Sequence, residues 1–377
     1  MAKAKRESLD DAKPGISVSD LQFAIEPITI ASERKSVFPD HRLLQINPDN
    51  MVIVGSMASV RVMFSLGLSE SFCVDAAAFC AVANFIDKSQ EIVFTLENSV
   101  LTWSSKHAKG KIATAAAVDL YTAFEAASSA FDCIGAIRTS PALTNLISLG
   151  SLSSNNGMLV NGSFAGFAIY PEQSGITYCA SSDNKTIALA YEKIDIPIKK
   201  PVYFSNTSVK LLVTLSNRDG FFNFDDRAMT FISEDEKTEV IVNQIDALRY
   251  DILIAAQKFM IENPLHRVKL ETRNIALYTK RVAELSERFN HAEVTLVAKN
   301  GGISLQFTEG VTENEEYFVV DQLNITADMK VRLNASNISL ALKQCNTLIA
   351  DFMNKDVLIF ENDDARNFTY IIAGKSA

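Results

Sequence analysis

Residue types that commonly perform chemistry are few and scattered in this sequence. The four histidines stand far apart, at His41, His107, His266 and His291. None has a second ligand at the spacing of a metal site. Asp225-Asp226 and Asp363-Asp364 lie in turn-like stretches, where solvated loops are the default interpretation and a weak metal site is the alternative. Gly374-Lys375-Ser376 lacks the upstream glycine of a phosphate-binding loop. Because no Ser/His/Asp or Cys/His arrangement stands out either, the sequence predicts a protein that is not an enzyme and has no metal or cofactor.

The cysteines indicate a reducing compartment. Their five positions are Cys73, Cys80, Cys133, Cys179 and Cys345. An odd, dispersed set with no CxxC pair predicts reduced, buried thiols. The first stretch, residues 1–16, is charged and has no apolar centre, so we expect a frayed tail and not a signal peptide. No apolar run approaches the roughly 18–20 residues that cross a bilayer, which predicts a cytoplasmic protein without a membrane partner.

Length and charge limit the remaining classes. A chain of 377 residues exceeds one typical core, which favours two or three domains. The 36 basic and 45 acidic residues give a net charge of −9. That balance argues against a protein whose whole surface binds nucleic acid, but it allows a locally basic face.

The elements that would position any site recur along the chain. Asp75, Ser205 and Asn334 follow short apolar strands and lie about 130 residues apart. All three are preferred N-cap residues, and helical apolar spacing follows each of them. A second set of helix starts, at Ser19, Ser140-Pro141 and Thr272, precedes meanders of alternating strands. The pattern predicts an α+β fold of helix-plus-meander units, two per domain, in three tandem domains. We place these domains at residues 17–130, 131–262 and 263–377.

Three segments carry a resemblance to a known family. Phe164–Ile169, Ile176–Asp183 and Phe368–Ile372 match segments of the bacterial DNA polymerase III β sliding clamp, and the likeness extends from Gly15 to Gly374. The resemblance implies three tandem DNA-clamp domains and a head-to-tail homodimeric ring with helices lining the hole. It also implies a processivity factor, which encircles duplex DNA without reading its sequence and tethers a polymerase. A closed ring holds DNA by topology, so strong contacts with the DNA are not needed.

The resemblance implies a set of cations that face DNA. On or near the expected inner helices these are Arg34, Lys35, Lys210, Arg218, Arg273, Lys280, Arg281 and Lys343. Such side chains attract phosphates diffusely and without reading bases. For any one of them, the solvated side of an amphipathic helix is an equally good interpretation.

In the family, a hydrophobic cleft between the middle and last domains binds short peptide motifs of the polymerase and the clamp loader. The matching positions here are Phe164, Ser182, Asn184, Lys185, Thr186, Ile187, Ile252, Leu253, Ile371, Ile372 and Ala373. Plain strand packing is the alternative for each of them. The sequence departs from the family at Asn184-Lys185-Thr186, where Gly-His-Arg is usual, and at its end, Ala373–Ala377. These departures predict a pocket reshaped for a different peptide, as in a divergent or bacteriophage-encoded clamp with its own polymerase.

The resemblance also implies a dimer interface. Lys111 and Ile112, on an edge strand of the first domain, match one side of it, with Leu285 and Phe289 as their counterparts. Core packing of Leu285 and Phe289 is an equal alternative.

Two other functions stay open on the sequence: a β-rich virion or adhesion-type scaffold, and an enzyme with an unrecognised site between domains. A clamp needs a capped amphipathic helix in all six half-units. Five of these are clear, and the first, Val18–Glu33, is weaker because Pro27 interrupts it.

Overall fold

The computed structural model describes most of the chain: residues 15–32, 36, 38–115, 118–154, 166–172, 174–183, 185–245, 251–261, 266–269, 277, 279–281, 283–284, 293–299, 302–309, 312–319, 329–350, 357–362, 367–373 and 375–376. Its contacts group into two compact units, residues 1–139 with 210–244, and residues 140–209 with 245–377. Each unit combines strands from two consecutive repeats, so the division into three domains stays a prediction.

The first unit is built on one antiparallel sheet. Its helices are α1 (Val18–Ala31), the short 3-10 helix η2 (Pro39–Arg42), α2 (Ala76–Phe85), α3 (Leu120–Ser129) and, from residue 210 on, α5 (Asn206–Ser216). Twelve strands among the described residues form the sheet in this order: β1 (Ile16–Ser17), β6 (Glu91–Glu97), β7 (Val100–Ser105), β8 (Lys109–Ala115), β5 (Phe72–Asp75), β2 (Leu43–Ile46), β3 (Met51–Val54), β4 (Ala58–Val62), β16 (Thr238–Asn243), β15 (Ala228–Ser233), β14 (Gly220–Phe224) and β9 (Gly135–Arg138).

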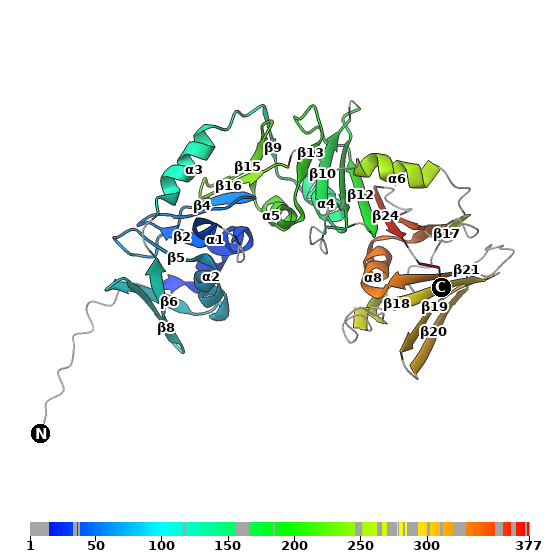
Figure 1. Ribbon diagram of the computed structural model, residues 1–377, viewed down its shortest axis with the longest axis horizontal. Coiled ribbons are helices and arrows are strands. Elements are labelled where there is room, and N and C mark those ends of the chain that lie inside the picture. The colour runs from blue at the N-terminus through cyan, green and yellow to red at the C-terminus, as the bar shows by residue number, and fades with distance from the viewer. Residues whose placement is uncertain are drawn as a thin grey trace, which may run out of the picture. The chain divides into compact units, whose positions relative to one another are not determined.

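The second unit contains two antiparallel sheets. Its helices include α4 (Pro141–Gly150), α6 (Ile252–Ile261) and α8 (Ala335–Gln344). In its described part, one sheet runs β13 (Val202–Phe204), β10 (Gly166–Pro171), β11 (Thr177–Ser182), β12 (Thr186–Glu192), β24 (Phe368–Ala373), β23 (Val357–Glu361), β22 (Thr347–Ala350) and β17 (His266–Lys269). The other runs β20 (Thr312–Val319), β19 (Gly302–Glu309), β18 (Glu293–Lys299), β21 (Met329–Asn334) and β25 (Lys375–Ser376). The predicted α+β class is confirmed (Figure 1).

Predicted helix caps account for most of the helix starts. Four of them accept an amide hydrogen bond from the first turn, at 2.8–3.3 Å: Asp75, Ser140, Ser205 and Asn334. The first helix differs, because it begins at Val18 and its cap is Ser17 instead of Ser19. Pro27 lies inside this helix without ending it. Thr272 lies outside the described residues.

Two helices occupy connecting stretches for which the sequence pattern predicts no element. α3 follows Asp119, whose carboxylate accepts the amide of Thr122 at 3.0 Å. α6 follows Asp251, whose carboxylate accepts the amide of Ile254 at 3.0 Å. In each case an aspartate before an apolar residue is the signal that would have identified the helix.

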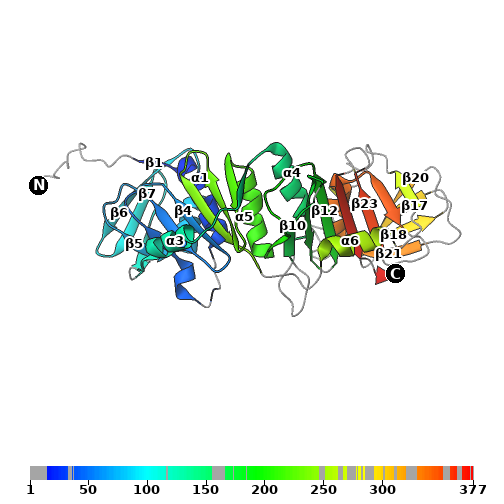
Figure 2. The same ribbon diagram turned by 90° about the horizontal axis from the view of Figure 1, so that it is seen from above.

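One strand pair in each unit joins two meanders into a continuous sheet. In the first unit β4 pairs with β16, and in the second β12 pairs with β24. α3 packs over the first of these junctions, on the sheet face opposite α1 (Figure 1). α6 packs over the second and lies across the strands around β12 and β23 (Figure 2). A connecting helix therefore covers each junction.

Burial of the thiols is confirmed for four cysteines and is wrong for the fifth. Cys73, Cys80, Cys179 and Cys345 are buried. Burial in apolar surroundings raises the pKa of Cys179, which keeps this thiol protonated. Cys133 is exposed, because it lies in the stretch between α3 and β9 where no helix or sheet face covers it.

The close approach of α4 to its sheet gives a test of the packing. A β-carbon at Gly150 would lie 2.5 Å from Cβ of Cys179 and 2.7 Å from its carbonyl oxygen. We therefore expect Gly150→Ala to lower the free energy of unfolding by about 1–3 kcal/mol, through overpacking. Urea denaturation measures this change. Asn145→Ala, on the exposed side of the same helix, is the control and should change it by less than about 0.5 kcal/mol; equal effects would contradict the packing.

Candidate functional site

Five of the residues expected to bind a partner peptide lie together in the second unit. Ser182 pairs with Ile187, and Ile187 pairs with Ile371, across β11, β12 and β24. Residues directly opposite each other in a sheet share a face, so these three side chains form one row. Ile252 and Leu253 of α6 pack on the same face. We call the surface formed by these five residues the α6 junction.

Two other predicted members point away from this surface. Thr186 and Ile372 pair with each other, one position from the row, and therefore lie on the opposite face. Both are buried, and the Thr186 hydroxyl donates to the Asp183 carboxylate at 2.8 Å. They therefore lie outside the α6 junction, because consecutive strand residues alternate between faces. The role of Thr186 is to fix the turn between β11 and β12.

The remaining members lie at the end of the strands or outside the described part of the chain. Lys185 and Ala373 are exposed, and the amide of Ala373 donates to the Lys185 carbonyl at 2.8 Å. This bond ties the two strand ends together beside the α6 junction. Phe164 and Asn184 lie outside the described residues.

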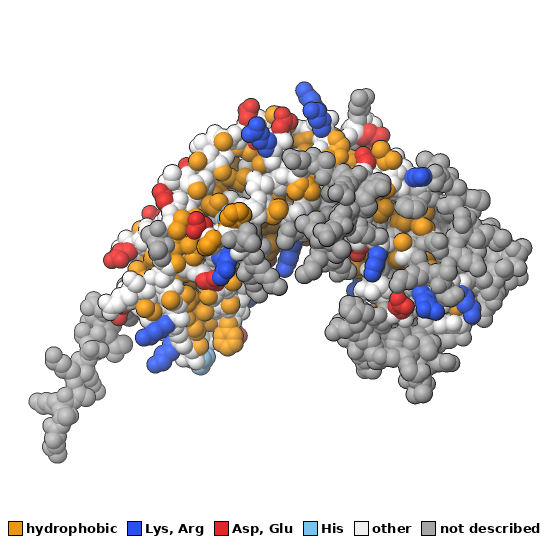
Figure 3. Space-filling model, in the orientation of Figure 1, with side chains coloured by type: hydrophobic (Ala, Val, Ile, Leu, Met, Phe, Trp, Pro, Cys, Tyr) orange, Lys and Arg blue, Asp and Glu red, His pale blue; other side chains and the backbone are white. Residues whose placement is uncertain are grey.

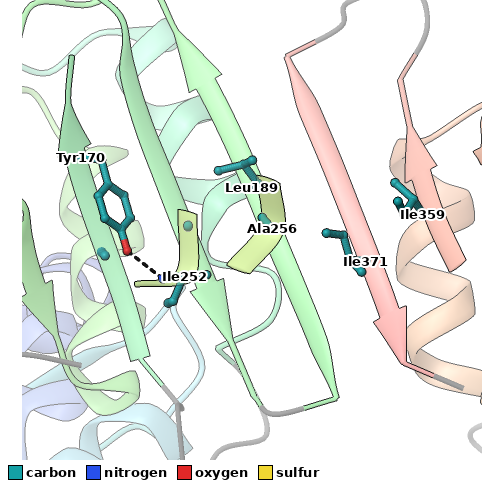
Figure 4. Packing of buried hydrophobic residues seen from close by; sticks show 8 residues of the cluster. Tyr170, Leu189, Ile252, Ala256, Ile359 and Ile371 are labelled. Carbon is teal, nitrogen blue, oxygen red and sulfur yellow. Dashed lines mark hydrogen bonds between the residues drawn. The ribbon is translucent and has the colours of Figure 1, made fainter. Parts of the chain in front are cut away.

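Tyr170 fixes the start of α6. Its hydroxyl accepts a hydrogen bond from the Ile252 amide at 3.1 Å, which satisfies one donor of the first helical turn (Figure 4). Burial, reinforced by the nearby Asp251 carboxylate, raises the pKa of Tyr170. Through Ile252 and Ala256 the helix then rests on an apolar bed that includes Leu189 and Ile371 (Figure 4).

The corresponding junction of the first unit has different chemistry. In the pairs β4–β16 and β12–β24, Ser59 takes the place of Ile187, and Arg61 takes the place of Leu189. The Arg61 guanidinium lies over the Phe124 ring of α3, 5.1 Å from its centroid.

Ion pairs extend this contact across the first junction. Arg61 pairs with Glu125 on α3 and with Glu239 on β16, while Ser128 donates to Glu239 at 2.6 Å. This network attaches α3 to its sheet through charges. The α6 junction instead keeps Ile187 and Leu253 partly exposed, and Ile254 beside them is exposed. An apolar surface of this kind suits a peptide with apolar side chains.

The cations expected to face DNA are spread over several elements. Lys210 on α5, Lys343 in the last turn of α8, and the helical residues Lys280 and Arg281 are exposed. Arg34, Lys35 and Arg273 lie outside the described residues. The sequences of α1 and α2 contain no lysine or arginine. On the face shown in Figure 3, the basic side chains of the described residues lie scattered within each unit.

Arg218 departs from its expected role. Its side chain is only 7% exposed, and it pairs with Glu26 at 2.9 Å. The same nitrogen donates to the carbonyl of Phe23 at 2.6 Å, and the guanidinium lies 4.1 Å from the centroid of the Phe23 ring. The expectation of a solvated cation is corrected, because this charge is neutralised inside the first unit.

The predicted dimer edge lies on β8. From Lys109 to Ala113 this strand pairs with β7, while β5 pairs only with Thr114 and Ala115 among the described residues. The other side of the strand is therefore an open edge along Lys111, whose side chain is exposed. Ile112 is buried opposite Leu101 and packs inside the unit. Leu285 and Phe289 lie outside the described residues.

Within the part of the chain that the structure describes, no group of three or more His, Cys, Asp or Glu side chains could hold a metal ion. Asp225 has a structural role, because its carboxylate accepts the amides of Arg227 and Ala228 at 2.5 and 2.6 Å in a tight turn. Among the described helices, none is both long and apolar enough to span a bilayer.

Comparison with solved structures finds one fold over nearly the whole chain. The DNA polymerase sliding clamp from Bacillus subtilis covers 96% of this chain and 98% of its own, with a TM-score of 0.67 and 14% identity. The sliding clamp from Pseudomonas aeruginosa covers 96% and 99%, with a TM-score of 0.66 and 14% identity. The DNA polymerase III β subunit from Bartonella birtlesii, bound to griselimycin, covers 96% and 99%, with a TM-score of 0.69 and 11% identity.

Sequence comparisons give no match, either among family models or among curated proteins. The chain therefore has the fold of the β sliding clamps, with a sequence only 11–14% identical to theirs.

The anchor of α6 can be tested by removing one oxygen. Tyr170→Phe leaves the Ile252 amide without its acceptor, so we expect the free energy of unfolding to fall by about 1–2 kcal/mol. Amide hydrogen exchange in α6 should become faster in the variant than in the wild type, while exchange in α4 should stay unchanged. Tyr121→Phe, at a more exposed tyrosine, is the control.

The same variant has a predicted pH dependence. A raised pKa means that the folded state favours the neutral phenol. The stability that this phenol contributes is fully present below the pKa of an unfolded tyrosine, about 10, and is lost as the pH rises above that value. Between pH 9 and pH 11 the free energy of unfolding should therefore fall more in the wild type than in Tyr170→Phe. The difference should correspond to the ionisation of one tyrosine in the unfolded chain. An identical alkaline decline in both proteins would contradict the burial of this phenol.

Proposed function

We propose that this chain is the subunit of a DNA sliding clamp, a non-enzymatic ring that encircles duplex DNA and tethers a polymerase. The observation that carries the proposal is the extent of the likeness: the solved clamps match over 96% of this chain and 98–99% of their own chains. A likeness limited to one domain of the solved clamps would cover only part of the chain. A match from end to end supports the same three-domain subunit and, with it, a head-to-tail dimeric ring.

The charge distribution supports a ring that slides. In a clamp the helices line the hole, and among the described residues the predicted DNA-facing cations that are exposed are Lys210, Lys280, Arg281 and Lys343. A few such cations attract the phosphate backbone diffusely and release it readily. The net charge of −9 disfavours DNA binding over the rest of the surface.

The α6 junction is the proposed docking site for the partner peptide. Of the two junctions, it alone combines partly exposed Ile187 and Leu253 with a helix held by an apolar bed. The first junction is occupied by the Arg61 ion pairs, which would have to break before an apolar side chain could enter. This contrast favours the α6 junction over the first junction as the site for the polymerase peptide. The exposed Lys185 and Ala373 at its end support a peptide preference different from that of other clamps.

The alternative of a β-rich scaffold has no observation in its favour beyond the strand content. A scaffold does not need capped amphipathic helices such as α2, α4 and α8, whereas a clamp does. The open edge of β8 at Lys111 supports subunit pairing in the ring, because an unpaired edge is normally covered.

Topological retention tests the function directly. The protein is loaded with its clamp loader onto nicked circular DNA and then passed over a gel-filtration column in about 0.5 M salt, where diffuse phosphate contacts are weak. We expect the protein to elute with the circle and to be released once a restriction enzyme linearises the DNA. Retention on circular and linear DNA alike would show ordinary binding, and loss from both would exclude a closed ring.

The docking site is tested separately. Ile187→Ala should weaken binding of the cognate polymerase's clamp-binding peptide about tenfold, which corresponds to roughly 1.4 kcal/mol of lost apolar contact. Fluorescence polarisation with an array of labelled polymerase peptides measures the effect. Ser59→Ala, at the corresponding position of the first junction, is the matched control and should leave affinity unchanged. Equal affinities for wild type and Ile187→Ala would place the site elsewhere while leaving the ring proposal intact.

A further inference from the structure

The first unit contains a groove that is separate from the α6 junction and has α1 on one side. Its volume is about 840 Å³, within the range of ligand pockets in proteins. α1, the end of β4 and the two turns at 217–219 and 233–238 form its walls. The amide of Met63 donates to the Lys237 carbonyl at 2.7 Å, which fixes one wall.

An aromatic side chain stands exposed at this groove in a fixed position. Phe23 is 63% exposed, although Arg218 stacks on its ring and bonds to its carbonyl. Met63, 42% exposed, also lines the groove. An exposed aromatic ring held in place loses little conformational entropy when a partner covers it, which is typical of anchors in protein interfaces.

The charges of the groove specify its occupant. Glu234 is neutralised by Arg138, with two contacts of 2.9 Å, and Asp235 pairs with Lys237 at 3.6 Å. Asp20 and Asp219 have no ion-pair partner among the described residues. Two unpaired carboxylates beside an apolar wall repel phosphate and attract a cation.

We infer that this groove, which we call the Phe23 groove, binds a peptide segment of another protein that presents an apolar side chain next to lysine or arginine. The apolar side chain packs between Phe23 and Met63, and the cation lies near Asp20 and Asp219. The groove lies in the first unit and the α6 junction in the second, so one subunit offers two chemically different peptide sites.

Three fluorescein-labelled peptides of 12 residues serve as probes, each with a central Leu-Phe pair and flanks of lysine, serine or glutamate. With the full-length protein, polarisation should show the lysine-flanked peptide binding at least fivefold tighter than the serine-flanked one, and the glutamate-flanked one weakest. Phe23→Ser should weaken the first at least fivefold, and Asp219→Lys should remove the preference for lysine.

Phe85→Ser is the matched control, since Phe85 is 80% exposed on α2 and does not line this groove. Its affinity for the lysine-flanked probe should equal that of the wild type. Ile187→Ala separates the two peptide sites, because it should weaken only the polymerase peptide.

Three outcomes would overturn the inference. They are equal affinity for all three probes, equal losses in Phe23→Ser and Phe85→Ser, and a Phe23→Ser variant that binds the probe normally but dissociates from DNA or from its own second copy. The last would assign Phe23 to DNA or to subunit contact.

Discussion

Pairing of strands from consecutive repeats is the constraint on which the rest of this structure depends. β4 pairs with β16 and β12 pairs with β24, so that the meander of one repeat ends on the edge of the next. Each pairing satisfies backbone groups that would otherwise form open sheet edges. It also creates a junction between two meanders that a connecting helix covers. The candidate peptide site is one of these junctions.

The two junctions have the same backbone arrangement but differ in chemistry at a few side chains. At the first, Arg61 replaces an apolar residue and engages carboxylates of both the helix and the neighbouring strand. At the second, leucine and isoleucine hold the helix, and Tyr170 caps it. The charged junction resists the entry of apolar groups because partly buried charges must keep their partners. The apolar α6 junction can exchange one apolar neighbour for another at little cost in free energy.

Sequence reasoning recovered the parts of this fold that depend on local chemistry. Asp75, Ser140 and Asn334 cap helices as expected, because a cap needs only a short polar side chain before an amphipathic run. The sequence pattern does not predict the connecting helices α3 and α6, since they lie outside the repeat from which the other helices are predicted.

The residues that the resemblance groups into one pocket only partly share a face, for a physical reason. Thr186 and Ile372 adjoin residues of the α6 junction in sequence, but the alternation of a strand places them on the opposite face. Arg218 was assigned to solvent because charge alone says nothing about a partner 192 residues away in sequence. The face of a strand residue can be derived from the alternation once one pairing is known, whereas long-range ion pairs and the junction of two meanders require the structure.

The absence of lysine and arginine from α1 and α2 has a consequence for motion. In the proposed ring, each phosphate contact would be a shallow energy minimum that the ring must leave before it can advance. A lining with few cations would give a smoother potential along the DNA, so diffusion along the duplex would be governed mainly by hydrodynamic drag. Residence time on DNA would then depend on how long the proposed ring stays closed and hardly at all on the strength with which its inner wall attracts the backbone.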